Sequence, residues 1–270
     1  MIDQDIKKEE SESKDYKKKA KFIFYNMYSP IEMSRLFERA GINYNSSLLN
    51  PVENADDYAT NVEKALNLGV YGVDLSYIRL FDQPQKSIEY LNTIQNLAGR
   101  LGIPKNVVDL ATSEVDHYIE DRDSLYRIAF EAFSKADDYL KKNDRNNIAA
   151  LIILGGWVET MHIALEGMNL DDPNEEMLSR IASQKYSLTS LVLMLGSYTD
   201  DLEIAKYLVY LRKLKRAFDK FEIYYEQGSV DIDTVNKKIE ETSGMKVEIS
   251  SSQLKEVYEI IIKIRKEIVS

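Results

Sequence analysis

The feature that most constrains this chain is a pair of apolar segments that each contain glycine and a carboxylate. One is LNLGVYGVDLSYIRLF, which begins at Leu66, and the other is LIILGGWVETMHIALEG, which begins at Leu151. Each glycine in a helix costs about 1 kcal/mol relative to alanine, so we expect a neighbouring helix to approach these glycines closely. An unpaired carboxylate in an apolar interface is strongly disfavoured, and each acid must therefore have a polar partner, a proton or access to water.

Four residues of these segments form the candidate ligand-binding or buried polar site: Tyr71, Asp74, Trp157 and Glu159. The 18 tyrosines of the chain favour buried acids that are held by tyrosine hydroxyls. In the functional alternative, the four residues line one cleft in which aromatic walls and a few polar groups suit a small ligand. Both interpretations predict that the two segments lie side by side at the centre of the molecule, with Tyr71 and Trp157 as packing anchors.

Helical patterns dominate the rest of the chain. The predicted helices cover residues 30–40, 55–80, 84–101, 105–119, 122–142, 146–166, 173–196 and 200–226, and a last helix closes the chain with apolar residues three and four apart from Leu254 to Ile268. Only GMKVEIS, which begins at Gly244, alternates as a strand does. The predicted fold class is all-α, a bundle of packed antiparallel helical hairpins.

Helix boundaries are marked by short motifs. SPIE predicts an N-cap at Ser29, and DQPQ and DDPNE predict acidic caps at Asp82 and Asp171 before Pro84 and Pro173. The predicted helix stops are Gly41, Gly102, Gly167 and Gly228. Because each Leu-Gly segment is followed by a proline-marked helix start at a similar interval, the sequence also predicts an internal near-repeat, a diverged duplication of a helical hairpin.

Composition limits the partners of the chain. Its 45 acidic and 35 basic residues give a net charge of −10, which repels a nucleic-acid backbone. A basic run, YLRKLKRAFDKF, contains Arg212, Lys213, Lys215 and Arg216, and such runs are most often a solvated helix face. The absence of cysteine excludes disulfides and thiolate metal sites, and Glu159 and His162 argue against a membrane span through the most apolar segment.

The N-terminus is expected to be a flexible charged tether, residues 1–22, before a single α-helical domain at residues 23–270. A tether of this kind suits a lipid anchor that precedes Met1 and has been removed. A ragged cytoplasmic N-terminus is the alternative, and composition favours neither.

A metal site is a further alternative. The two histidines of the chain each follow a glutamate by three residues, as Glu114 with His117 and Glu159 with His162. Paired E-x-x-H motifs ligate di-iron centres in four-helix bundles, together with a glutamate from each of two other helices. The candidates for those two glutamates, Glu63 and Glu203, have no distinguishing setting.

The segments LGVYGVDLSY and LGGWVE resemble a group of uncharacterised all-helical proteins of Bacteroidetes-type bacteria that are regarded as cell-envelope lipoproteins. The resemblance implies an all-helical domain tethered outside the cytoplasm, with no established activity. Residues 154–159 match the recognisable segment of that group, and a histidine at His162 is not part of it, which weakens the metal alternative.

We therefore expect a helical binding or structural protein of the cell envelope or periplasm, with a small molecule or a protein as its partner. Nucleic acid is not expected as a partner, and a membrane only through the removed lipid anchor. The sequence lacks phosphate-binding, nucleophile-elbow and dinucleotide motifs, so we favour a non-enzymatic protein without a cofactor. The alternatives are a metal-dependent helical-bundle enzyme and a protein-interaction scaffold of stacked helical hairpins.

Overall fold

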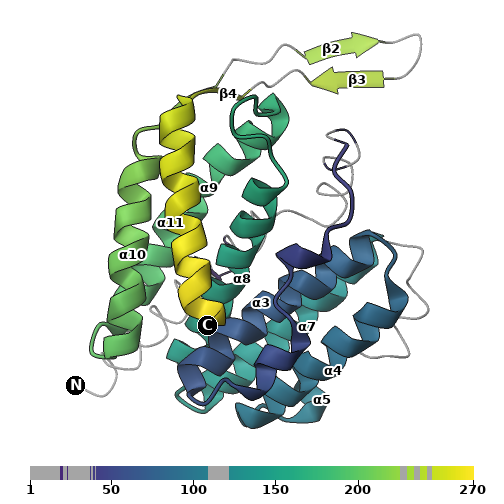
Figure 1. Ribbon diagram of the computed structural model, residues 1–270, viewed down its shortest axis with the longest axis vertical. Helices are drawn as coiled ribbons and strands as arrows, with labels where there is room; N and C mark the ends of the chain where they lie inside the picture. Colours follow the sequence, from purple (N-terminus) through teal and green to yellow (C-terminus); the bar gives the residue numbers. More distant parts are fainter. Residues whose placement is uncertain are drawn as a thin grey trace.

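The computed structural model describes residues 19–20, 23, 37, 39, 41–108, 122–225, 230–233, 238–241 and 245–270 (Figure 1). Its helices are α3 (Asn61–Leu80), α4 (Pro84–Arg100), α5 (Lys105–Val108), α7 (Arg122–Lys142), α8 (Asn146–Glu166), α9 (Glu175–Leu195), α10 (Leu202–Phe218) and α11 (Ser251–Val269). Short 3-10 helices are η1 (Ser46–Leu48), η2 (Val52–Asp56) and η3 (Gly196–Tyr198). The predicted all-α class of packed helices is confirmed.

Helix α8 is the central element of the bundle. Every residue from Ile148 to Leu165 is buried, because α3, α7, α9 and α11 all pack against it. A helix that is apolar on all sides needs such complete cover. By length and composition, α8 is also the one described helix able to cross a membrane, and 94% of its most apolar window is buried within the chain.

The other helices form layers around α8. Helix α4 packs on α3 on one side, whereas α10 packs against both α9 and α11 on the other side (Figure 1). Helix α11 also contacts α3, so the C-terminal helix reaches the same interface that the two Leu-Gly segments form.

Most predicted helices are present with small changes at their ends. Helices α7 and α8 match residues 122–142 and 146–166. The predicted start of α3 at residue 55 is wrong, because the 3-10 helix η2 precedes a capping box in which Thr60 and Glu63 bind each other's backbone N–H groups. A second capping box, between Ser250 and Gln253, starts α11.

The two predicted acidic caps are also wrong. Asp82 has a φ of +51°, outside the extended conformation that an N-cap needs, and Gln83 takes the cap position before Pro84. At α9, the cap is Asn174, whose side chain accepts hydrogen bonds from two backbone N–H groups of the first turn. Pro173 therefore stays outside the helix that it was expected to begin.

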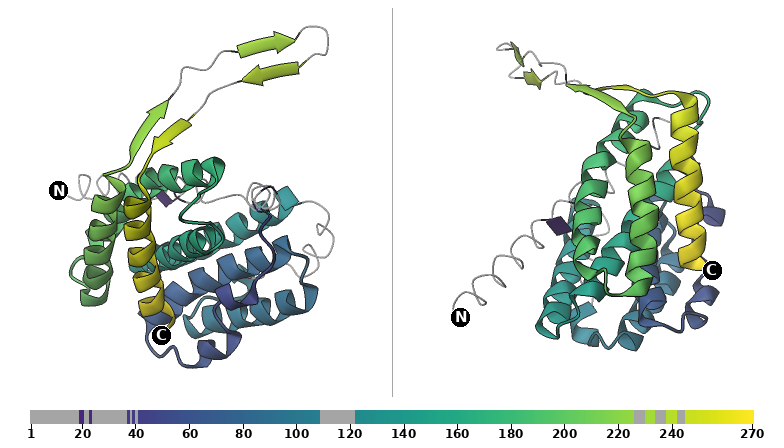
Figure 2. Two further views of the ribbon diagram at one scale, coloured as in Figure 1. Left: turned by 45° about the horizontal axis from the view of Figure 1, so that its top comes forward. Right: turned by 90° about the vertical axis from the view of Figure 1, so that its left-hand side faces the viewer.

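The predicted helix over residues 200–226 is too long. Helix α10 ends at Phe218, and Glu222–Tyr225 forms strand β1, which pairs antiparallel with β4 (Met245–Glu248). The period of two in GMKVEIS correctly marks β4. Strands β2 (Val230–Asp233) and β3 (Lys238–Glu241) form a second antiparallel ribbon, and the two ribbons extend away from the helices (Figure 2).

Several predictions fall on residues outside the described ranges. These are residues 1–18, 21 and 22 of the tether, most of helix 30–40 with the cap at Ser29, residues 109–119 of helix 105–119, and the stop at Gly228. At the end of the predicted tether, Lys19 and Ala20 are helical. Gly41 and Gly102 have positive φ, as expected of helix stops.

Candidate functional site

Helices α3 and α8 approach each other through glycine, as the sequence predicts. A Cβ atom on Gly69 would stand 2.0 Å from the carbonyl oxygen of Ile152 and 2.6 Å from the backbone nitrogen of Gly156. Only residues without a side chain allow backbones to pack this closely. Gly72 does not take part, because the space around its missing Cβ is open.

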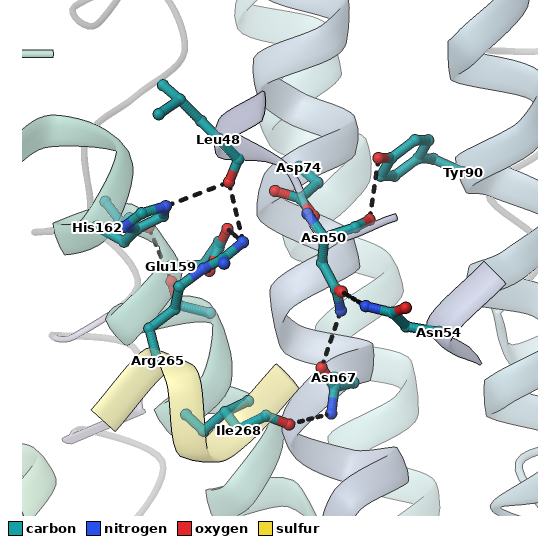
Figure 3. Close-up of polar contacts among 12 residues, drawn as sticks. Leu48, Asn50, Asn54, Asn67, Asp74, Tyr90, Glu159, His162, Arg265 and Ile268 are labelled. Carbon is teal, nitrogen blue, oxygen red and sulfur yellow. Dashed lines mark hydrogen bonds and ion pairs between the residues drawn. The ribbon is translucent and has the colours of Figure 1, made fainter. Parts of the chain in front are cut away.

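Glu159 of α8 forms an ion pair with Arg265 of α11 (Figure 3). Nε and Nη2 of Arg265 lie 3.0 and 3.1 Å from the two carboxylate oxygens of Glu159, which makes the pair bidentate. The Glu159 side chain is fully buried and that of Arg265 is 16% exposed. Arg265 also donates from Nη2 to the carbonyl oxygen of Leu48 at 2.9 Å.

Asp74 of α3 completes this group of charges. Its Oδ2 accepts a hydrogen bond from the backbone N–H of Asn50 at 3.1 Å. Burial, followed by the negative charge of Glu159, raises the pKa of Asp74 well above its usual range. Burial raises the pKa of Glu159 too, but Arg265 opposes that shift. The proton of the pair is therefore on Asp74, whose buried Oδ1 has no hydrogen-bond partner.

His162 lies one turn beyond Glu159 on α8. Its Nε2 is 3.2 Å from the carbonyl oxygen of Leu48 and donates to it, whereas its buried Nδ1 has no hydrogen-bond partner. Burial, followed by the charge of Arg265, lowers the pKa of His162 to about 4. The imidazole is therefore neutral near pH 7. We call Asp74, Glu159, His162 and Arg265 the buried centre.

The buried centre holds the segment that joins η1 to η2. The carbonyl oxygen of Asn50 accepts a hydrogen bond from the Tyr90 hydroxyl at 3.0 Å, and that of Pro51 accepts one from the Tyr71 hydroxyl at 2.7 Å. The side-chain amide of Asn50 donates to Tyr58 and to Asn67, at 2.9 and 3.1 Å. The backbone of this segment is thus bonded from α3 and α4, and the carbonyl oxygen of Leu48 just before it is bonded from α11.

Asn67 links the same network to the C-terminus. Its side-chain amide donates to the carbonyl oxygen of Ile268 at 2.7 Å (Figure 3). The same amide also donates to the carbonyl oxygen of Glu63 at 3.0 Å. The last turn of α11 is therefore tied to α3 by Asn67 and to α8 by Arg265.

Three of the four predicted site residues belong to this network and one does not. The three members are fully buried: Tyr71, Asp74 and Glu159. Trp157 is also fully buried, but its indole N–H donates to Oε1 of Gln184 on α9, at 3.1 Å. Trp157 lies two residues from Glu159 and points to another side of α8, so the four do not line one cleft.

Tyrosine hydroxyls do not hold the acids, contrary to the favoured interpretation. The Tyr71 hydroxyl donates to a backbone carbonyl. The partner of Glu159 is Arg265, and the partner of Asp74 is the backbone N–H of Asn50. Sequence reasoning missed Arg265, because it stands on the polar edge of an amphipathic helix among Lys and Glu residues. The sequence does indicate that such a residue exists, because two acids buried in apolar helices need a cation nearby.

Two of the four residues of the alternative metal site, Glu159 and His162, lie within the described residues. Glu114 and His117 lie outside the described residues, and Glu159 uses both of its carboxylate oxygens on Arg265. In the described part of the chain, no group of three or more histidine and acidic side chains is placed to hold a metal ion.

A shallow pocket of about 390 Å³ lies away from this network, on the surface of α4 and α5, lined by Asn92, Gln95, Asn96, Gly99, Ile103 and Lys105.

No family model, no curated protein and no solved structure matches this chain. Its function therefore has to be inferred from its own residues.

Proposed function

We propose that this chain is a helical binding or structural protein of the cell envelope, and that the buried centre fixes its fold. In this proposal, Arg265 holds the C-terminal helix and the segment after η1 against the α3–α8 pair. Ligands or partner proteins then bind to surfaces that this core supports, rather than at Asp74 and Glu159.

The observation that supports the proposal is the set of partners of Arg265. It bonds both oxygens of Glu159 on α8 and the carbonyl oxygen of Leu48, the last residue of η1. One cation from the end of the chain thereby joins three elements that are far apart in sequence. A reaction centre needs room for a substrate beside its acid and base, whereas Asp74 and Glu159 have no exposed surface.

Hydrogen exchange tests the structural role. Glu159→Gln weakens the bond to Arg265, so the amides of α11 and of residues 48–51 should exchange faster, with a smaller change in α4. The matched control is Glu256→Gln, which removes a surface ion pair of α11 with Lys220 and should leave that exchange unchanged. Equal effects of the two variants would contradict the proposal.

The envelope location rests on the lipoprotein resemblance and on the charged N-terminal segment. Expression of the complete gene in its native bacterium, followed by fractionation and labelling with a radioactive fatty acid, tests it. The expected result is labelled protein in the membrane fraction. Unlabelled protein in the cytoplasmic fraction would overturn this part of the proposal.

The two alternatives have less support. In stacked repeats, each unit contacts only its neighbours, whereas α3 packs against both α8 and α11. A metal-dependent enzyme would require Glu159 to exchange Arg265 for a metal ion. Elemental analysis of protein purified without chelator, before and after Glu114→Gln and His117→Gln, tests that alternative directly.

A further inference from the structure

The outward face of α10 combines exposed aliphatic and basic side chains. Leu202 is 84% exposed and Val209 is 64% exposed. Residues seven apart lie on one side of a helix, so Leu202, Val209 and Arg216 share a line along α10, with Arg212 and Lys213 beside it. We call these five residues the α10 stripe. Helix α10 lies between α9 and α11 at the edge of the bundle and faces the viewer in Figure 2, right.

The charges of the stripe are not used within the described part of the chain. Two acids nearby already have partners, because Asp219 pairs with Lys215 at 2.8 Å and Glu267 pairs with Lys206 at 2.7 Å. Arg212, Lys213 and Arg216 form no ion pair or hydrogen bond with other described residues.

This face differs in charge from the chain as a whole. Helix α10 contains five basic residues and one acidic residue, in a chain of net charge −10. An isolated positive face on an acidic protein attracts an anionic partner while the remaining surface is repelled, which orients the encounter. The partner that meets this face is therefore expected to be anionic.

The exposed apolar residues narrow the choice of anionic partner. Within the described residues, most of the large apolar side chains that are exposed lie on α9 and α10: Tyr186, Leu193, Leu202 and Val209. A protein interface usually has a contiguous apolar core that becomes dry on binding. A bilayer surface instead accepts separate aliphatic side chains among its headgroups while phosphates bind cations spread along a helix.

We propose that the α10 stripe docks onto an anionic phospholipid surface. Helix α10 lies flat on the bilayer along its length of about 25 Å. Leu202 and Val209 enter the headgroup region, and Arg212, Lys213 and Arg216 contact lipid phosphates. This binding holds with or without a lipid anchor, so its failure would leave the envelope location untouched.

Vesicle co-sedimentation of the full chain tests the proposal. The protein should sediment with vesicles that contain phosphatidylglycerol and stay in solution with pure phosphatidylcholine. Each basic residue near the surface contributes a factor of about five to partitioning, so Arg212→Gln, Lys213→Gln and Arg216→Gln together should weaken binding about 100-fold. Leu202→Ser with Val209→Ser should weaken binding without removing its salt dependence.

The matched control changes three other exposed basic residues, as Lys105→Gln, Lys135→Gln and Lys142→Gln. It has the same net charge as the stripe variant and should bind like the parent chain. Thermal melts should be the same for all variants, because every changed side chain is exposed. Equal binding by the stripe variant and the control overturns the proposal. Binding to polyglutamate through the stripe, without binding to anionic vesicles, would assign the face to an acidic protein and also overturn it.

Discussion

The backbone of Gly155 lies directly against that of Leu66, so that a Cβ atom on Gly155 would stand 1.9 Å from the Leu66 carbonyl oxygen. The contact fixes α3 on α8 without any intervening side chain. Asp74 and Glu159 follow these contacts along the two helices, and their proximity is a consequence of the glycine packing. The chain thus uses glycine to bring together two acids that then need Arg265.

Gly155→Ala should be severely destabilising, because the obstacle to the new methyl group is backbone that cannot rotate away. We expect a loss of several kcal/mol in the free energy of unfolding, measured by urea denaturation. Gly72→Ala is the matched control on α3, where the space is open. It should stabilise the protein by about 0.5–1 kcal/mol, because alanine is the better helix former. Similar effects at both positions would contradict the packing described here.

The sequence was sufficient to predict this glycine contact, because a helical glycine in an apolar run has few explanations other than close packing. The same local logic predicted α7 and α8 to the residue. It failed at residues 222–225, where the strand depends on pairing with Met245–Glu248, a partner some twenty residues away. It failed at Asp82 because a capping motif does not specify the backbone conformation of the preceding turn.

The single tryptophan gives an optical test of the core. Trp157 is fully buried and donates its indole N–H to Gln184. Native protein should therefore emit at short wavelength and resist quenching by iodide, and emission should shift to the red on unfolding. Strong quenching of the native protein would show that α8 is not enclosed as described.

The ion pair between Glu159 and Arg265 should be strongly coupled. Removing one partner of a buried pair costs about 3–5 kcal/mol, because the other charge is left buried and unpaired. Arg265→Met should cost more than Glu159→Leu, since Glu159 has no exposed surface and Arg265 is 16% exposed. The double variant should be more stable than the sum of the two losses predicts. Additive losses in denaturation would show that the two side chains act independently.

Identification of Arg265 as the partner required the three-dimensional arrangement. The sequence predicted correctly that Asp74 and Glu159 need partners, but many basic residues were available. The choice depends on how α11 packs, and no local pattern specifies it. Trp157 was assigned to the same cleft by its place in the Leu-Gly pattern, although a separation of two residues turns it away from Glu159 on a helix.

His162 should make stability depend on pH. Its pKa is lowered to about 4 in the folded chain from an ordinary value of 6.5. The stability that its neutral form contributes is complete above pH 6.5 and is lost as pH falls toward 4, by about 3 kcal/mol in total. His162→Gln can still donate to Leu48 and does not titrate. The parent chain should therefore lose stability relative to this variant between pH 7 and pH 4, and parallel profiles would refute the assignment.

Asp74 should also make stability depend on pH, but in the direction opposite to that of His162. Its pKa is raised in the folded chain, so the stability from its protonated form is complete below the ordinary value of 3.8 and is lost as pH rises toward the folded pKa. Asp74→Asn keeps an acceptor for the Asn50 N–H and has no proton to lose. Its stability relative to the parent chain should therefore increase as pH rises above about 4, measured by denaturation at several pH values in one buffer series. A relative stability of Asp74→Asn that falls with pH would mean that Asp74 is ionised in the folded chain, and the proton would then have to be placed on Glu159 or removed from the pair.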